Sequence, residues 1–250
     1  MTAFVAVVRV TLLQLLGRKK LLGFGLLSLI PAALLFFAAR ARVGPGLDTD
    51  LGAMVVSPFF SIVLPVTALI LGGAALGDER RDKTLSFLVL RPMGRLTIVV
   101  AKTVAAIGAS LLFAVIGTLG LALVYAVGGG GLNVIPSVLA GATVLVVAYA
   151  SIFTLLGNVT TRPTVVGLLY IVFVENAFVQ ELPRLAPISP WRMGLAATLD
   201  LMPDDYPARA LLGGIGELVP SWTNAMLATV GIVVVSIAIG TVLLRRRDAV

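Results

Sequence analysis

Residues 53–77 read AMVVSPFFSIVLPVTALILGGAALG, and none of these side chains carries a charge. A helix needs about 20 predominantly apolar residues to cross a hydrocarbon layer roughly 30 Å thick. The strands of a membrane barrel would instead alternate apolar and polar residues over about 10 positions. The stretch is long enough to span and does not alternate, so it predicts a transmembrane α-helix.

Similar apolar segments recur along the whole chain. They lie at residues 21–39, 53–77, 98–127, 133–157, 164–179 and 224–244, and the fifth is the shortest. Of the 250 residues, 59% are hydrophobic and 12% are charged, whereas a soluble domain carries about 25% charged residues. The sequence therefore predicts an all-α integral membrane protein with six transmembrane helices, built as a single transmembrane domain over residues 1–250.

Two residue types that carry much of enzyme chemistry are absent, because the chain contains no cysteine and no histidine. Disulfides, the usual zinc sites and Ser-His-Asp triads are therefore excluded. We expect no catalytic residue and no metal site on this chain.

Lysine and arginine are distributed unevenly between the two sides of the predicted membrane. With both termini on one side, that side holds 14 of the 19 Lys and Arg residues, and the opposite side holds five. Positive residues accumulate in cytoplasmic loops, so we expect both termini to be cytoplasmic. The formal net charge of +7 reflects this topology, and we expect no nucleic-acid partner.

Regions outside the spans also carry structural signals. Residues 1–18 predict an interfacial helix with Thr11, Gln14 and Arg18 on one face. Lys102 lies in the long third segment, where its side chain is expected to reach toward the lipid headgroups. Six prolines within residues 180–221 forbid one continuous helix, so short external re-entrant or interfacial helices are expected before the last span.

The loop between the second and third segments carries the functional signal. Residues 77–95 read GDERRDKTLSFLVLRPMGR. The acidic residues at its start favour a helix N-terminus, and Leu85, Leu88 and Val89 form an apolar stripe that Pro92 ends. A solvated loop needs no such stripe. The pattern therefore predicts a short amphipathic cytoplasmic helix that packs on another surface.

This segment resembles the type-2 permease family of ATP-binding cassette (ABC) transporters. Subunits of that family often show a pattern like E-x-x-x-G-T-L-E-x-L-L-x-x-P-x-S-R at this place. The matching residues are Glu79, Thr84, Leu85, Leu88, Pro92 and Arg95. Lys83 stands where glycine is common and Gly94 where serine is common. The likeness in topology extends over essentially the whole chain.

The resemblance implies a division of labour between subunits. The segment after the second span would be a coupling helix that docks on a separate ABC ATPase. The residues it assigns to ATPase coupling are Glu79, Arg80, Arg81, Thr84, Leu85, Leu88, Val89, Arg91, Pro92 and Arg95, with a second contact at Thr160, Thr161 and Arg162. Since the chain lacks a G-x-x-x-x-G-K-[ST] loop, it would bind no cofactor itself, and ATP and Mg²⁺ would bind the partner ATPase.

The resemblance also implies a setting for the chain. It would be a non-enzymatic permease subunit of an exporter in the cytoplasmic membrane of a bacterium or archaeon. It would pair in the bilayer with a second permease half, either identical or related.

Two further pairs of residues are candidates for packing or transport. Gly73 and Gly77 form a G-x-x-x-G pair, which allows close helix contact inside the subunit or at a dimer interface. Glu175 and Asn176 close the fifth segment. A carboxylate in the membrane marks a pathway or gate, whereas the same residue near the outer surface would be interfacial.

Other functions fit the residues as well. A secondary transporter or channel is one alternative, although such proteins usually place ionisable residues deep in their spans. A non-transporting scaffold or assembly factor, for example in metalloenzyme maturation, is another. The apolar spans weakly favour an amphipathic or lipid-like cargo.

Overall fold

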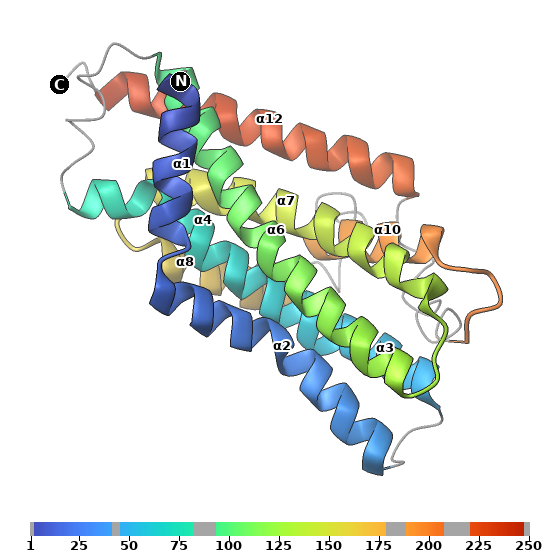
Figure 1. Ribbon diagram of the computed structural model, residues 1–250. Helices are drawn as coiled ribbons and strands as arrows, with labels where there is room; N and C mark the ends of the chain where they lie inside the picture. The colour runs from blue at the N-terminus through green and yellow to red at the C-terminus, as the bar shows by residue number, and fades with distance from the viewer. Residues whose placement is uncertain (1–2, 42–45, 83–93, 179–188, 208–220, 248–250) are drawn as a thin grey trace.

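The computed structural model describes residues 3–41, 46–82, 94–178, 189–207 and 221–247, and these contain helices and no β-strand (Figure 1). The elements are α1 (Ala3–Leu15), α2 (Arg18–Ala41), α3 (Leu47–Met54), η1 (Val55–Val63), α4 (Leu64–Arg81), α6 (Arg95–Val127), η2 (Leu132–Val134), α7 (Ile135–Val159), α8 (Pro163–Leu169), η3 (Tyr170–Phe178), α10 (Pro190–Leu201) and α12 (Trp222–Arg247).

Five helical stretches are long and apolar enough to cross a membrane. They are Arg18–Ala41, Leu47–Arg81, Arg95–Val127, Leu132–Val159 and Trp222–Arg246. The remaining predicted segment, 164–179, coincides with α8 and η3, which are shorter. The predicted all-α membrane class is thus confirmed.

The second long stretch is a continuous helix with an irregular middle. It comprises α3, the π-helical turns of η1, and α4. Pro58 lies inside η1 and cannot donate a backbone hydrogen bond, which favours a local widening of the helix. Pro65 lies in the first turn of α4, where a missing N–H is tolerated. Of the two prolines, Pro58 therefore marks the distortion.

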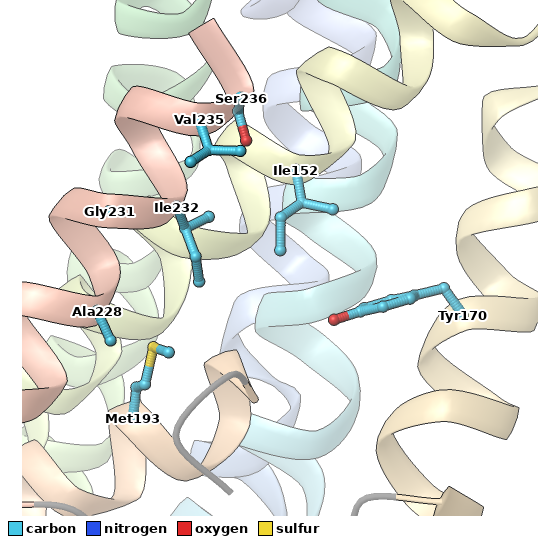
Figure 2. A pocket seen from close by; sticks show the side chains of 8 residues that line it. All are labelled: Ile152, Tyr170, Met193, Ala228, Gly231, Ile232, Val235 and Ser236. Atoms are coloured by element: carbon cyan, nitrogen blue, oxygen red, sulfur yellow. The ribbon is translucent and has the colours of Figure 1, made fainter. Parts of the chain in front are cut away.

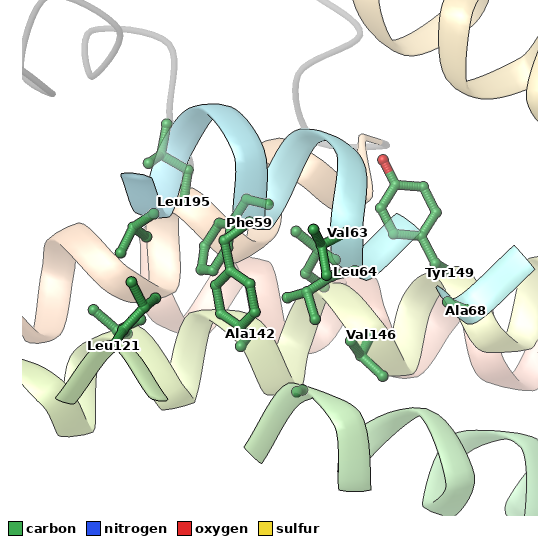
Figure 3. Packing of buried hydrophobic residues seen from close by; sticks show 14 of the residues in the cluster. Phe59, Val63, Leu64, Ala68, Leu121, Ala142, Val146, Tyr149 and Leu195 are labelled. Atoms are coloured by element: carbon green, nitrogen blue, oxygen red, sulfur yellow. The ribbon is translucent and has the colours of Figure 1, made fainter. Parts of the chain in front are cut away.

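Helix α7 is the centre of the bundle, and it packs on α4, α6, α10 and α12. The largest hydrophobic cluster combines side chains from several of these helices (Figure 3). Phe59 and Leu64 come from the second stretch, Tyr149 from α7 and Leu195 from α10, and all four are almost fully buried. α7 is the most buried of the long helices, whereas α2 and α12 are the least buried.

Glycines let the backbone of α7 approach its neighbours closely. A Cβ atom built on Gly157 would lie 2.5 Å from the carbonyl oxygen of Gly73 on α4. A Cβ atom on Gly141 would lie 2.4 Å from the carbonyl oxygen of Gly194 on α10. Real Cβ atoms cannot occupy these positions, so both helix pairs depend on glycine.

Polar contacts gather at the two ends of the bundle. At one end, Lys20 on α2 lies 3.9 Å from Asp78 on α4, and the Asn158 side chain donates to the Gly240 carbonyl of α12 across 3.0 Å. We call this the basic end because Lys and Arg residues concentrate here. Outside α1, those in the described part of the chain are Arg18, Lys19, Lys20, Arg80, Arg81, Arg95, Lys102, Arg162, Arg245, Arg246 and Arg247. The first and last helices start and finish here (Figure 1).

The opposite end is held by tyrosine and aspartate. Tyr125 on α6 donates to the carboxylate of Asp48 on α3, and Tyr206 donates to the Tyr125 hydroxyl across 3.1 Å. Burial raises the pKa of Tyr206, so this phenol remains a protonated donor at physiological pH. Asp200 accepts from the backbone N–H of Trp222 at 2.9 Å and thereby caps α12.

Helix α1 lies across α6 at the basic end (Figure 1). Val7, Thr11 and Leu15 face the bundle and are buried, whereas Val10 and Leu13 are exposed. Of the three residues predicted to share one face of this helix, Thr11 is buried against the other helices, whereas Gln14 and Arg18 are exposed.

Alanine substitutions should separate crowded glycines from open ones. Gly157→Ala is expected to destabilise the protein by about 1–3 kcal/mol, because its methyl group would collide with the α4 backbone. Gly231→Ala on α12 meets nothing within 4 Å, and is expected to be neutral or to stabilise by up to about 1 kcal/mol. Thermal unfolding in detergent measures the stability of both variants. Equal melting temperatures would contradict the close approach of the α4 and α7 backbones at Gly157.

Candidate functional site

The residues assigned to ATPase coupling are described only in part. Glu79, Arg80 and Arg81 end α4, and Arg95 begins α6, so both flanks of the predicted coupling helix lie at the basic end. The remaining assigned residues of this segment fall outside the described part of the chain, namely Thr84, Leu85, Leu88, Val89, Arg91 and Pro92.

A buried ion pair joins α4 to α6 beside this segment. The Lys102 ammonium contacts the Glu79 carboxylate, and the Lys102 side chain is only 2% exposed. The expectation that Lys102 reaches the headgroups is wrong. Its side chain starts on the buried face of α6 that packs on α4, and in this low-dielectric setting a charge requires a nearby partner.

A second contact joins α4 to the end of α7, just before the turn that leads to α8. Arg80 donates to the Asn158 carbonyl across 3.1 Å. In the turn itself, the Arg162 backbone N–H donates to the Thr160 hydroxyl across 3.2 Å. Thr161 and Arg162 are exposed. The structure thus places the second assigned contact, Thr160 to Arg162, beside the end of α4.

The pair Gly73 and Gly77 packs within the chain. A Cβ atom on Gly73 would lie 3.2 Å from the Pro163 Cβ atom, and one on Gly77 would lie 3.6 Å from the Gly157 Cα atom. The pair therefore faces the end of α7 and the start of α8, which corresponds to the intrasubunit alternative. A dimer contact need not be invoked to explain this motif.

Glu175 lies in a polar cluster nearer the opposite end. Its carboxylate accepts a hydrogen bond from Ser189 across 2.6 Å and one from Tyr170 across 3.2 Å. The residue is 6% exposed. Glu175 thus contacts protein groups and does not face solvent as an interfacial residue would. Asn176 belongs to η3, and its side chain is outside the described part of the chain.

Sequence reasoning missed the other members of this cluster. Arg192 on α10 is 4% exposed, and its backbone N–H donates across 3.2 Å to the same Ser189 hydroxyl that donates to Glu175. The neighbouring Trp191 donates its indole N–H to the Ser61 hydroxyl across 3.1 Å and so fixes α10 against η1. The only sequence signal for this cluster was the adjacent pair Trp191 and Arg192 in a chain with few charges. Their contacts could not be predicted, because a partner such as Ser61 lies far away in the sequence.

An apolar cavity of about 450 Å³ adjoins the cluster. It lies between α7, η3, α10 and α12, and Figure 2 shows the Tyr170 ring extending into this space. The lining residues are Ile152, Tyr170, Met193, Ala228, Gly231, Ile232, Val235 and Ser236. This lining suits a hydrophobic group. No cluster of three metal-ligating His, Cys, Asp or Glu side chains occurs among the described residues.

Removal of the buried ammonium should be costly. Lys102→Met leaves the Glu79 carboxylate without its cation and is expected to destabilise the protein by about 3 kcal/mol. Lys19→Met removes the same charge from an exposed position of α2 and is expected to change stability by less than about 0.5 kcal/mol. Denaturation in detergent measures both variants, and equal stability of the two would contradict the buried pair.

Glu175 allows a parallel test of the polar cluster. Glu175→Leu removes the acceptor for Ser189 and Tyr170, so we expect a loss of about 1–3 kcal/mol. Glu175→Gln keeps an acceptor oxygen, so its loss of stability should be smaller than that of Glu175→Leu. Melting temperatures in one detergent provide the comparison, and the opposite order of the two variants would show that the cluster is not held by these hydrogen bonds.

The comparisons with known proteins agree with this architecture. Residues 5–249 match the family described as "ABC-2 family transporter protein". The comparison with curated proteins gives no match. The matched region covers almost the entire chain and confirms the family that residues 79–95 predicted. This chain belongs to the ABC-2 family of transporter proteins and is a membrane component of an ABC transporter.

Proposed function

We propose that this chain is one of two membrane halves of an ATP-driven exporter. A separate ABC ATPase binds ATP and Mg²⁺ and hydrolyses the nucleotide, and the second half is an identical or related permease. Membership of the ABC-2 family supports the ATPase partner. The apolar cavity supports an amphipathic or lipid-like cargo.

The observation that carries this proposal is the attachment of α4 at the basic end. Glu79 joins α4 to α6 through Lys102, and Arg80 joins it to the end of α7 through the Asn158 carbonyl. A displacement of the coupling segment would therefore move three long helices together. Transporters convert ATPase motion into rigid-body tilting of this kind.

The two ends of the bundle have different roles in this mechanism. The basic end faces the cytoplasm and the ATPase, because positive residues concentrate there. Glu175 lies toward the other end, where we assign it to the gate of the pathway. Its bond to Ser189, the N-cap of α10, joins η3 to α10, so the loss of this bond would accompany separation of these elements.

The coupling helix provides the direct test of function. Leu88→Asp places a charge on the apolar stripe, and burying one charge costs several kcal/mol. We therefore expect the variant to lose co-purification of the ATPase. At least about 90% of the vanadate-sensitive ATP hydrolysis should be lost with it. Ser86→Asp adds the same charge off the stripe and should retain the ATPase. Both variants are purified gently from the native membrane.

Two outcomes would contradict the proposal. One is retention of the ATPase by Leu88→Asp at the level of Ser86→Asp, which would remove the coupling role from this stripe. The other is a wild-type preparation without any nucleotide-dependent partner, which would favour a channel or a membrane scaffold.

A further inference from the structure

A polar cavity opens at the basic end between α2, α4 and α8. Its volume is about 580 Å³, within the range of roughly 300–1,000 Å³ typical of small-molecule sites. Gly73 and Gly77 form part of its wall.

Cationic side chains outnumber anionic ones around this cavity. Lys20, Arg81 and Arg162 line it, and Asp78 is the one carboxylate among its lining residues. Asp78 lies 3.1 Å from Arg81 and 3.9 Å from Lys20. Arg162 has no carboxylate within 4.0 Å among the described residues. The cavity therefore retains positive charge after its internal pairs are formed.

The other lining residues combine hydroxyl and apolar groups. Thr161 and Thr164 present hydroxyls beside the cations, whereas Ile70 and Val165 are apolar. From Val165 the exposed side chains along α8 and η3 are also apolar, namely Val166, Leu168, Leu169, Val172 and Phe173. A ligand that fits both parts has an anionic oxygen-rich group and a hydrocarbon chain.

The position of the cavity selects the source of such a ligand. α2 begins at Arg18, α4 ends at Arg81 and α8 begins at Pro163, so the cavity lies where spanning helices reach the headgroup layer. We propose that it binds the phosphate of an anionic phospholipid from the leaflet at the basic end. Basic pockets between membrane helices suit such headgroups. The phosphate contacts Arg162 and Lys20, and an acyl chain follows α8.

Native mass spectrometry of the full chain in detergent tests the proposal without any ATPase, so its outcome is separate from that of the proposed function. The probes are dioleoyl phosphatidylglycerol, dioleoyl phosphatidylcholine and glycerol phosphate at equal concentration. We expect phosphatidylglycerol to bind at least about fivefold more tightly than phosphatidylcholine, and glycerol phosphate to bind negligibly.

Matched variants locate the bound lipid. Arg162→Gln and Lys20→Gln should each weaken phosphatidylglycerol binding about fivefold, whereas Arg162→Lys should preserve it. Arg246→Gln and Lys19→Gln remove the same charges at the same end but outside the cavity, and they should bind as wild type. All these side chains are at least partly exposed, so folding should be retained.

Three results would overturn the proposal. Equal binding of phosphatidylglycerol and phosphatidylcholine would remove the selectivity for anionic lipid. Equal losses in the cavity and control variants would show a diffuse surface-charge effect. Binding of glycerol phosphate as tight as that of the lipid would assign the cavity to a soluble phosphate ester.

Discussion

The close approach of the α4 and α7 backbones is the constraint on which the rest of the structure depends. At Gly157 no side chain separates the helices, and even a methyl group would overlap the Gly73 carbonyl. The next residue, Asn158, is thereby placed to accept from Arg80 and to donate to Gly240 on α12. In a bilayer, where lipid tails are as apolar as the side chains, helices associate through such packing and hydrogen bonds. Glycine at this contact therefore positions the polar groups of the basic end.

Helix α6 and the long stretch that contains α4 are joined near both of their ends. Lys102 contacts Glu79 at the basic end, and Tyr125 donates to Asp48 at the opposite end. Between these contacts lie the apolar core and the π-helical turns around Pro58. The two helices thus form a braced pair, and the π-helical turns lie between its two braces. A braced pair suits transmission of a displacement from one membrane surface toward the other.

Two buried ionisable side chains of the described helices follow the same physical rule. The hydrocarbon layer offers no water, so an ionised side chain inside the protein requires donors or a counter-charge. Glu175 has Ser189 and Tyr170, and Lys102 has Glu79. Where charges reach the headgroup layer, water and lipid phosphates can solvate them, and the cations around the cavity beside Arg162 retain an excess of positive charge. In the described part of the chain, one end of the bundle is therefore rich in Lys and Arg, and the opposite end is joined by tyrosine and aspartate side chains.

The sequence by itself determined the helices and the family, because crossing a bilayer requires a contiguous apolar segment, and the motif at residues 79–95 that resembles the family is contiguous as well. Predicted segments such as 98–127 lie within a few residues of the observed helices. Only the tertiary structure decided where polar side chains point. Lys102 turns toward a carboxylate 23 positions earlier, and Glu175 accepts a hydrogen bond from a serine 14 positions later. The glycine spacing at Gly73 was visible in the sequence, but its partner on α7 was not. Such pairings depend on which helix faces form the interfaces, and that is set by packing across the whole bundle.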